Sequence, residues 1–179
     1  MTTVRPMRPE ERDDVRDLLA EAYLPYEKEM VPAVFARYLD SVIVTDENQT
    51  LVAVDGDDTV LGTARLYLPG TAPMTPRRPV EWTDPMPADW AWVRSVAVRP
   101  AVRGTGVAPT IMAYCKGHVG DATAILLHTM DFMPAAIRLY ERLGYERVPR
   151  WDFQAGRAAA TSMDETFHAK AYRLTLGPE

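Results

Sequence analysis

The chain has 179 residues, 47% of them hydrophobic and 25% charged, which is ordinary for a soluble globular protein, and we expect one domain spanning residues 1–179. The formal net charge is −5, and no run of lysines and arginines forms the basic stripe that phosphate neutralisation requires, so no nucleic-acid partner is expected. A single cysteine excludes an intrachain disulfide. The N-terminus is highly charged, and no apolar run approaches the roughly 18 residues that a membrane span needs. We therefore expect a cytoplasmic protein with no membrane partner.

The N-terminal part of the chain predicts a strand followed by two helices. Residues 2–7 are strand-like, and a helix follows from Arg8. Its apolar residues recur at helical spacing, at Val15, Leu18, Leu19 and Ala22. A second, amphipathic helix is predicted over residues 31–39.

A hairpin and a long loop come next. Residues 51–54 and 60–68 are strand-like, and the sequence Asp55-Gly56-Asp57-Asp58 between them is a strong hairpin signal. The stretch over residues 68–89 is rich in proline and is predicted to be a loop. Loops of that length inside a compact domain often have a function, such as that of a substrate lid.

The second half of the chain alternates strands and helices. The predicted elements are a strand (90–98), a glycine-containing turn (103–108), a helix (to about 119), a strand (124–129), a helix (134–143) stopped by Gly144, and two last strands (145–148 and 167–176) with a polar, alanine-rich loop between them. This order indicates a mixed α+β fold with one sheet and a parallel crossover in its second half.

The turn after the strand over residues 90–98 has the composition of an anion site. Gly104 and Gly106 let the backbone approach a ligand closely, and Arg103 adds positive charge. Backbone N–H groups that open a helix lack helical partners, and with the helix dipole they favour a phosphate or pyrophosphate. An ordinary turn whose glycines only redirect the chain is the alternative. A dinucleotide fingerprint fails because Pro109 stands where a third small residue belongs, and no P-loop sequence exists.

Two landmarks in this order resemble the GNAT superfamily of N-acetyltransferases. Residues 103–108 (Arg-Gly-Thr-Gly-Val-Ala) match the signature Arg/Gln-x-x-Gly-x-Gly/Ala, and they follow a strand that ends in Val96-Ala97-Val98. The sequence over residues 136–145 is similar to the family pattern A-x-x-L-Y-x-x-x-G-F/Y. The opening Val4-Arg5-Pro6 before a charged helix is also similar to many family N-termini, so the resemblance covers nearly the whole chain.

The resemblance implies a fold and a co-substrate. The fold would be an α+β (mixed α/β) domain whose central, mostly antiparallel mixed sheet carries helices on both faces and a parallel, splayed strand pair at the acyl-CoA site. Acetyl-CoA, or another acyl-CoA, would be the co-substrate and a small molecule the acceptor.

Particular residues receive roles from the same resemblance. The backbone of Val96, Ala97 and Val98 would pair with the pantetheine arm. The turn would hold the pyrophosphate through Arg103, Gly104, Thr105, Gly106, Val107 and Ala108. Tyr140 would protonate the departing thiolate, because a phenol with a pKa of about 10 can donate to a thiolate whose conjugate acid has a pKa near ~8.5. Simple packing is the alternative role for this tyrosine.

The chain departs from the family where the general base usually lies. Many members have a Glu on the strand before the signature, and here Trp90 and Trp92 occupy the candidate positions. In an alternating strand these two share a face with Arg94 and Val96. Either they complete a core, or they bind an acceptor that has a planar or apolar body and an acidic group for Arg94. Tyr26 is a further candidate acceptor contact.

The remaining candidates for the base are weak. Glu27, Glu81, Asp84 and Asp89 are the spare carboxylates, and none stands at a convincing position. Met133 occupies the place where many relatives have an Asn that contacts the cofactor, which removes one expected contact.

No metal site is expected, since His118, His128 and His168 are scattered and lack cysteine or paired carboxylate partners. His128 ends a predicted strand and either lines the mouth of the active site or is structural. Cys115 lies in an apolar helical run and is interpreted as a core residue rather than a nucleophile.

Three functions stay open at this point: an N-acetyltransferase for a small molecule or an amino-acid-like metabolite, a related enzyme with a longer acyl donor or a hydroxyl acceptor, and a non-catalytic acyl-CoA-binding module. Tyr140 and the intact turn favour catalysis. Homodimer formation is a further expectation.

Overall fold

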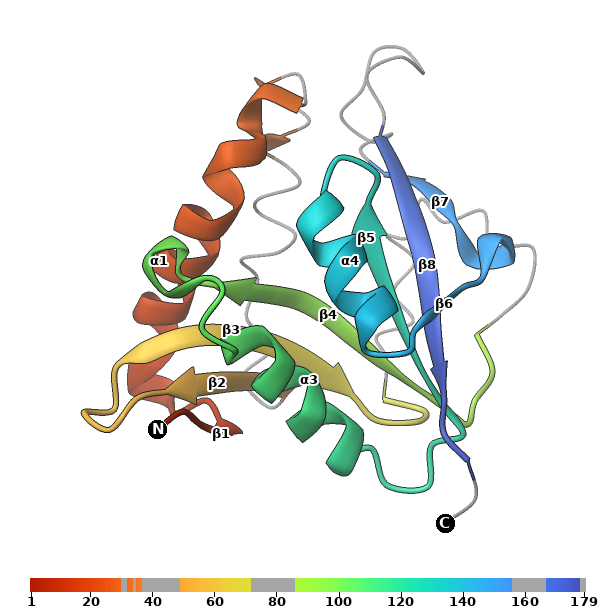
Figure 1. Ribbon diagram of the computed structural model, residues 1–179, viewed down its shortest axis with the longest axis horizontal. Coiled ribbons are helices and arrows are strands. Elements are labelled where there is room, and N and C mark those ends of the chain that lie inside the picture. The colour runs from red at the N-terminus through yellow and green to blue at the C-terminus, as the bar shows by residue number, and fades with distance from the viewer. Residues whose placement is uncertain (30–31, 34, 37–48, 72–85, 156–166, 178–179) are drawn as a thin grey trace.

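Eight strands form one sheet in the order β1-β2-β3-β4-β5-β8-β6, with β7 paired to β8 (Figure 1). The computed structural model describes residues 1–29, 32–33, 35–36, 49–71, 86–155 and 167–177. The strands are β1 (Thr3–Pro6), β2 (Thr50–Val54), β3 (Val60–Tyr67), β4 (Trp90–Val98), β5 (Ala124–Met130), β6 (Glu146–Arg147), β7 (Phe153–Ala155) and β8 (Phe167–Thr175).

Only one pairing in the described sheet is parallel. β4 and β5 run parallel, and all the other neighbours are antiparallel. The chain returns from β4 to β5 through α3 (Val107–Gly117), as a parallel pair requires a crossover. The predicted mixed, mostly antiparallel sheet with a parallel crossover in its second half is confirmed.

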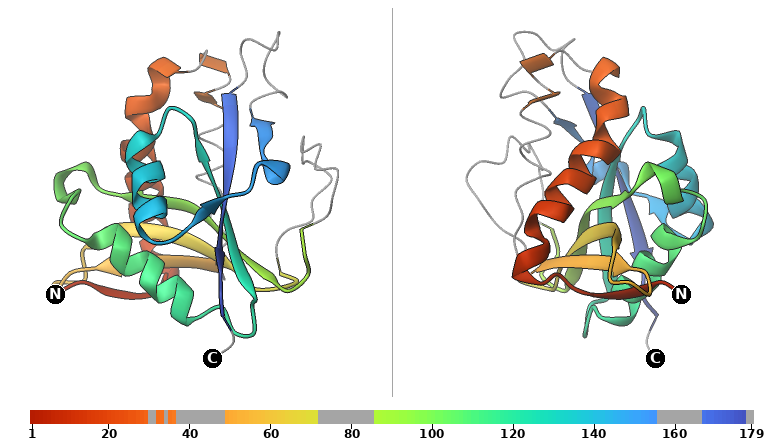
Figure 2. Two further views of the ribbon diagram at one scale, coloured as in Figure 1. Left: turned by 45° about the vertical axis from the view of Figure 1, so that its right-hand side comes forward. Right: turned by 90° about the vertical axis from the view of Figure 1, so that its left-hand side faces the viewer.

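Helices cover both faces of the sheet, as Figures 1 and 2 show. α1 (Arg12–Tyr23) lies on one face, and its predicted apolar stripe (Val15, Leu18, Leu19 and Ala22) is buried against β2 and β3. α3 and α4 (Pro134–Arg142) lie on the other face, where Ile111 and Tyr140 join the apolar side chains of β3, β4 and β5. We refer to these faces as the α1 face and the α3–α4 face.

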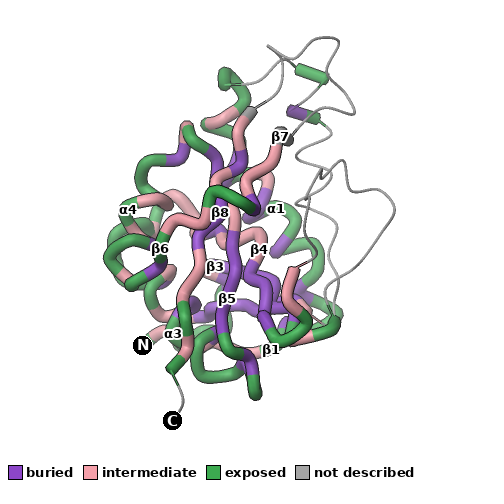
Figure 3. Tube along the Cα trace, turned by 90° about the vertical axis from the view of Figure 1, so that its right-hand side faces the viewer, coloured by how far each residue is buried: buried purple, intermediate pink, exposed green. Residues whose placement is uncertain are grey.

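A third cluster is aromatic and lies on the α1 face beyond the residues that α1 covers. Its largest members are Tyr67, Trp90, Trp92 and Trp151. Trp151 belongs to a short 3-10 helix, η5 (Pro149–Trp151), which carries the chain from β6 to β7. Figure 3 shows that the buried residues lie along the central strands of the sheet.

The predicted turns appear where their sequences place them. β2 and β3 form the expected hairpin, and Asp58 adopts a φ of 62° in its turn. The Asp55 carboxylate accepts the N–H groups of Asp57 (2.9 Å) and Thr59 (3.0 Å), which fixes the turn from within. Gly144 ends α4 with a φ of 84°, the left-handed conformation that glycine adopts without a Cβ clash.

Three features differ from the sequence-based expectations or lie beyond them. β7 was predicted to be loop, because three residues inside a polar stretch carry no alternation that would reveal a strand; it forms by pairing with β8. Most of the helix predicted over residues 31–39 lies outside the described residues. So does most of the proline-rich stretch, for which a function such as that of a substrate lid is expected.

Candidate active site

The sheet opens between its two parallel strands. β4 and β5 pair from Trp90–Ala124 to Val93–Leu127, and the pairing stops there although β4 continues to Val98 and β5 to Met130. Figure 1 shows the two strands diverging toward their C-terminal ends. We call the paired part the closed end (residues 90–93 and 124–127) and the diverging part the splay (residues 94–98 and 128–130). Among the described strands, none occupies the edge of β4 that faces the splay.

A bulge in β4 marks the start of the splay. Ala64 of β3 faces both Ser95 and Val96, so β4 carries one extra residue at this point. Ser95 has a φ of 50°, in the left-handed region that residues with a Cβ adopt only when the surrounding structure imposes it. A strained residue therefore lies where the two strands separate.

The bulge corrects one prediction about side-chain direction. The extra residue reverses the alternation, and Val96 packs with the apolar residues of the α3–α4 face. Trp90 and Trp92 belong to the aromatic cluster on the α1 face. The prediction that Val96 shares a face with Trp90, Trp92 and Arg94 is therefore wrong, because it assumed unbroken alternation.

Val98 presents its backbone groups to the splay. The Arg99 N–H donates to the Leu61 carbonyl (2.9 Å), which makes these residues a hydrogen-bonded pair. In an antiparallel ladder such pairs alternate with pairs whose polar groups point to the outer edges. The next pair, Gly62–Val98, is of that second kind, so the Val98 N–H and carbonyl point away from β3. Ala97 instead turns its backbone toward β3 and buries its side chain beside α1.

The glycine turn leads directly from the splay into α3. Gly104 and Gly106 have φ values of 80° and 95°, and no heavy atom lies within 4 Å of a Cβ built on either residue. Gly106 is the N-cap of α3, so the N–H groups of Val107 and Ala108 have no carbonyl one turn back to bond. Pro109 has no N–H to satisfy. The turn is exposed, and its free donors and the helix dipole suit a phosphate group.

Two side chains of the turn are used within the protein. The Arg103 guanidinium donates to the carbonyl of Ala22 (3.0 Å), near the C-terminal end of α1. The Thr105 hydroxyl donates to the carbonyl of Val102 (2.8 Å). Both bonds hold the turn in place, and Arg103, predicted to add charge to the phosphate site, is directed to α1 in this structure.

Tyr140 lies on α4, buried on the far side of the splay from α1. Its side chain is 5% exposed, and its ring centroid lies 5.9 Å from that of Tyr145. Burial raises the pKa of the Tyr140 phenol far above its ordinary range, and Tyr23, Tyr145, Cys115 and Tyr26 raise it further. Tyr23 and Tyr26 come from the α1 face, so the phenol is within electrostatic reach of both sides of the sheet. A phenol with a raised pKa stays protonated at neutral pH and therefore has an O–H available as a hydrogen-bond donor.

The predicted acceptor residues on β4 are divided between the closed end and the splay. Trp90 packs against Trp151, with ring centroids 4.8 Å apart, at the end of β4 farthest from the splay. Of the two roles left open for Trp90, core packing and acceptor contact, this position favours core packing. Arg94 is the first β4 residue beyond the last parallel pair, and its guanidinium lies 4.5 Å from the centre of the Trp92 ring.

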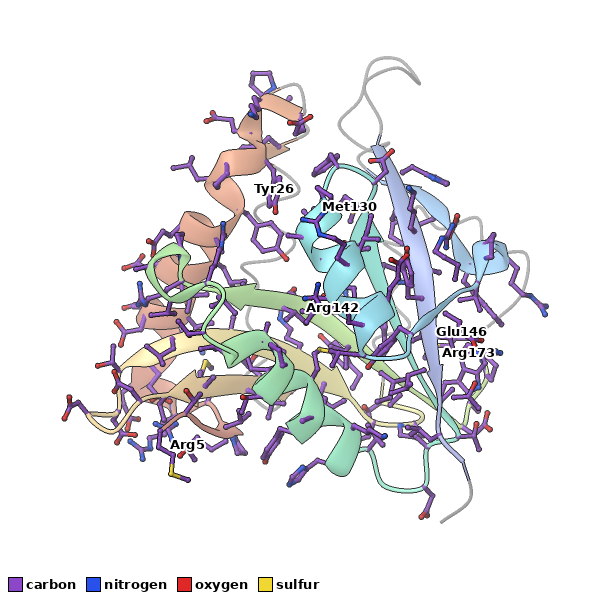
Figure 4. All side chains as sticks on the ribbon, viewed as in Figure 1. Arg5, Tyr26, Met130, Arg142, Glu146 and Arg173 are labelled. Carbon is purple, nitrogen blue, oxygen red and sulfur yellow. The ribbon has the colours of Figure 1, made fainter. Side chains whose placement is uncertain are left out.

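Tyr26 faces the segment between β5 and α4. It lies in the 3-10 helix η2 (Leu24–Glu29) that follows α1, and its ring centroid lies 5.7 Å from that of Phe132. Figure 4 labels Tyr26 on one side and Met130, at the end of β5, on the other. Tyr26 is thus placed at the end of the splay, where a group entering from the α1 face would meet it.

Of the carboxylates considered for the general base, Asp89 lies away from the splay, and Glu27 follows Tyr26 on η2. Asp89 precedes β4 and accepts a hydrogen bond from the Thr123 hydroxyl (2.6 Å), about 17 Å of strand away from Arg94 at ~3.3 Å per residue. Glu27 is exposed on η2. Glu81 and Asp84 lie outside the described residues.

Met133 and Cys115 are core residues. Met133 is buried at the N-cap of α4, and the Thr129 hydroxyl donates to its sulfur (3.9 Å). Cys115 is fully buried, and burial raises the pKa of its thiol to about 12, so the thiolate needed for nucleophilic attack does not form at neutral pH. Its interpretation as a core residue is confirmed.

Within the part of the chain that the structure describes, His, Cys, Asp and Glu side chains do not gather in groups of three or more that could hold a metal ion. The described helices include none that is long and apolar enough to cross a membrane.

The sequence did not predict that Ser95 and His128 lie at the splay; the structure shows it. Ser95 carries no glycine-like signal for a left-handed bulge. His128 was noted as the end of a strand, but its position opposite Arg94 depends on the register of β4 against β5. A count of residues from the expected end of each parallel strand is the sequence signal that points to His128.

Comparison with known proteins agrees with this geometry. No curated protein matches the sequence. An acetyltransferase of the GNAT family from Staphylococcus aureus Mu50 is 11% identical, with a TM-score of 0.66 over 99% of this chain and 100% of that one. The ribosomal-protein-S18-alanine N-acetyltransferase of Escherichia coli is 14% identical, with a TM-score of 0.64 over 100% and 96% of the two chains. A histone acetyltransferase HPA2-related acetyltransferase from Corynebacterium glutamicum is 20% identical, with a TM-score of 0.63 over 99% and 98%.

These similarities in structure establish the fold, and the sequence itself gives the family. The profile of the acetyltransferase (GNAT) family matches residues 12–145, a span that runs from the start of α1 through the splay, the glycine turn and Tyr140 to the end of α4. The chain therefore belongs to the GNAT acetyltransferase family.

Proposed function

We propose that this protein transfers the acetyl group of acetyl-CoA to the amine of a small acceptor, by direct attack with both substrates bound. The observation that carries the proposal is the convergence of three features on the splay. Val98 offers its N–H and carbonyl at the open edge of β4, the glycine turn opens α3 beside it, and Tyr140 lies buried across from them. The family supplies the general reaction, and these residues supply its site.

The described residues fit an acyl-CoA. An arm with amide groups can add to the free edge of β4 as an extra strand, using Val98 as hydrogen-bonding partner. The N–H groups of Val107 and Ala108 are free to hold a pyrophosphate at the N-terminus of α3. Gly104 and Gly106 leave room for the phosphates because neither has a side chain and no neighbouring atom fills the space.

Tyr140 supplies the proton for the leaving group. The phenol is protonated at every ordinary pH because burial and its neighbours raise its pKa. Proton transfer to the departing thiolate moves the negative charge from sulfur to the phenol oxygen, and a proton released by the attacking amine then neutralises that oxygen. The sheet itself keeps the phenol dry, because Tyr140 packs with Tyr145 and the apolar face of α3.

The acceptor is proposed to carry an acidic group or a planar apolar body. Arg94 stands at the start of the splay with its guanidinium over Trp92, which places a cation and an aromatic surface together on the α1 face. A carboxylate bonds well to the planar fork of an arginine, while a polyamine or an aminoglycoside is repelled by it. Tyr26 adds a further aromatic contact from η2.

The test is an acceptor screen with acetyl-CoA that follows the release of free thiol. We expect turnover with a small amine that carries an acidic or aromatic group, and weak or no turnover with polycations. Longer acyl-CoA donors and hydroxyl acceptors are included, and a clear preference for either would replace the N-acetyl assignment. A chain that binds acetyl-CoA but turns over no acceptor of any class would contradict catalysis.

A further inference from the structure

His128 stands opposite Arg94 at the point where the sheet opens. The last parallel pair is Val93–Leu127, so Arg94 and His128 are the next residues on their two strands. Both lie on the α1 face, because they follow Trp92 and Leu126 by two residues and those belong to the aromatic cluster. A group that enters the splay from the α1 face therefore has Arg94 on one side and His128 on the other.

The imidazole of His128 is held in a fixed orientation. Its Nε2 donates a hydrogen bond to the main-chain carbonyl of Trp151 (2.8 Å). Phe153 approaches the ring in an edge-to-face arrangement, with centroids 5.0 Å apart, and Trp92 does so at 6.1 Å. Three separate elements, β4, η5 and β7, thus restrain one side chain on β5.

The bond to Trp151 decides which nitrogen is basic. A carbonyl can only accept a hydrogen bond, so Nε2 carries the proton and, in the neutral ring, Nδ1 carries the lone pair. The two nitrogens point in divergent directions, and Nδ1 is turned away from Trp151. Nδ1 is buried in the ligand-free chain, so it meets an acceptor only after that acceptor has entered between β4 and β5.

We propose that His128 is the general base that removes a proton from the acceptor amine, a role that rests on the acetyl transfer proposed above. Nδ1 takes one proton from the acceptor ammonium, which leaves a neutral amine with a free electron pair. That pair forms the new C–N bond at the thioester carbonyl. When the C–S bond breaks, the second amine proton replaces the one that Tyr140 gives to sulfur, and His128 returns its own proton to solvent.

The two acid–base groups then act from opposite faces of the sheet. Tyr140 belongs to the α3–α4 face and His128 to the α1 face, and the splay is the opening between them. In this arrangement the amine enters from the α1 face and the thiolate is protonated from the α3–α4 face, so the two proton transfers do not compete for the same space. This arrangement gives the chain a base on β5 in place of the carboxylate that Trp90 and Trp92 replace on β4.

The charges around the imidazole come from several elements. Arg94 lies on β4, and Arg65 of the neighbouring strand β3 is its partner in the antiparallel register. Arg150 of η5 stacks on the Trp151 ring at 4.7 Å. Asp152 lies beyond Trp151, bound to Arg147 and to the Ala171 N–H and 3.7 Å from His168. The Asp152 carboxylate is thus bound to other partners.

The test compares His128→Gln with His118→Gln in the full chain. Glutamine can donate its amide N–H to the Trp151 carbonyl from the position of Nε2, but it has no nitrogen that titrates. His118 is an exposed histidine at the C-cap of α3, where its Nδ1 meets the Tyr114 carbonyl (2.8 Å), so its variant controls for the loss of a histidine. Each variant is assayed with acetyl-CoA and the best amine of the screen across pH 5.5–9.5.

We expect His128→Gln to lower kcat at pH 7 by about 10²–10⁴-fold, the usual contribution of a general acid or base. The wild type should lose activity on acidification with the profile of a histidine, which titrates near ~6.5 in peptides. The glutamine variant should lack that limb and should regain activity steadily as rising pH deprotonates the amine itself. The acetyl-CoA thermal shift of both variants should equal that of the wild type.

Two outcomes separate this inference from the proposed function. If the wild type acetylates an amine and His128→Gln keeps the wild-type kcat and pH profile, His128 is not the base and the acetyl transfer stands. If the wild type releases no thiol with any amine, the proposed function fails first. A second readout needs no turnover: ¹⁵N NMR of the His128 ring should show the neutral Nε2–H form at pH 8, and an Nδ1–H form would overturn the assignment.

Discussion

The two ends of β4 share β3 as a neighbour on one side, but only one end is paired with β5 on the other. At the closed end, Trp90 and Trp92 are buried, β5 is paired in register, and the aromatic cluster fills the α1 face. At the splay, four residues later, the parallel partner has separated, Ser95 is in a left-handed conformation and Arg94 stands at the opening. One strand thus runs from a tightly packed core into a site.

This difference shows how the fold separates rigidity from chemistry. The Trp90 ring packs against that of Trp151 in a tilted arrangement, with centroids 4.8 Å apart, and the Arg173 guanidinium lies 5.7 Å from its centre, so the closed end is held by packing within the aromatic cluster. The backbone groups that the splay leaves without a strand partner are positioned by that fixed end. A site built on the continuation of a rigid strand is held more precisely than one built on a loop.

The largest effect is expected at the splay, from Tyr140→Phe. Removing the phenol proton should lower kcat by about 10²–10⁴-fold, the usual range for a lost general acid, with the acetyl-CoA thermal shift nearly unchanged. Because the pKa of Tyr140 is raised, the loss should be the same across pH 6–9. Steady-state kinetics with the best acceptor measures it, under conditions where chemistry limits turnover.

A variant with wild-type kcat would show that Tyr140 only packs in the core. Tyr145→Phe is the matched control, since Tyr145 lies 5.9 Å away in the same cluster and has no part in the proposed reaction. Its kcat should stay close to that of the wild type.

At the closed end, Trp90→Ala is expected to lower stability and to leave the binding of the acceptor unchanged. Truncating a buried tryptophan usually costs about 3–5 kcal/mol of unfolding free energy, because the contacts and the buried area are lost and a cavity remains. Denaturant unfolding measures this loss, and the acceptor KM of the folded fraction should not change. A variant of wild-type stability with a raised acceptor KM would instead place Trp90 in the acceptor site.

Gly106→Glu tests the anion site at the start of α3. The residue has a φ of 95°, so any Cβ brings backbone strain, and a carboxylate there repels the pyrophosphate. The wild type should gain about 2.7 kcal/mol of stability at an acetyl-CoA concentration of 100 Kd, and the variant should gain almost none. Thermal unfolding with and without acetyl-CoA measures both.

Gly120→Glu provides the control for backbone strain. Gly120 has a φ of 59° with no heavy atom near its Cβ position, and it lies in the turn between α3 and β5. This variant should lose stability without losing the acetyl-CoA shift. If Gly106→Glu also keeps the full shift, the glycine turn does not bind the pyrophosphate.

Features set by a few neighbouring residues could be predicted from the sequence. β4 occupies the residues 90–98 expected from its aromatic and β-branched pattern. The glycine turn and the end of α4 also lie where predicted, because the left-handed conformations of Gly104, Gly106 and Gly144 are local necessities. The family signature drew attention to the same turn and to Tyr140.

Features that depend on pairing between residues far apart in the sequence could not be predicted from it. The bulge at Ser95 arises from the register of β4 against β3, and serine gives no sign of it. β7 is strand only because β8 lies beside it. The placement of Arg94 and His128 as the first residues beyond the last parallel pair follows from the register of β4 against β5, which depends on contacts between residues far apart in the sequence.

The smallest effect is expected from Arg94, and it decides the acceptor class. Arg94→Ala should raise the KM for an acidic acceptor about 10-fold, close to the 1.4 kcal/mol of one modest charged hydrogen bond, and leave the acetyl-CoA shift unchanged. Arg94→Lys should recover only part of this loss, because a lysine lacks the planar two-pronged contact.

Arg173→Ala is the matched control at the closed end. The Arg173 guanidinium also lies over a tryptophan, 5.7 Å from the Trp90 ring centre, but away from the splay. Two like charges 4 Å apart cost about 4 kcal/mol at an effective dielectric constant of ~20, so polycations should be poor substrates of the wild type and better ones of Arg94→Ala. A polyamine that is the best wild-type acceptor would mean that Arg94 points away from the acceptor and serves only to cover Trp92.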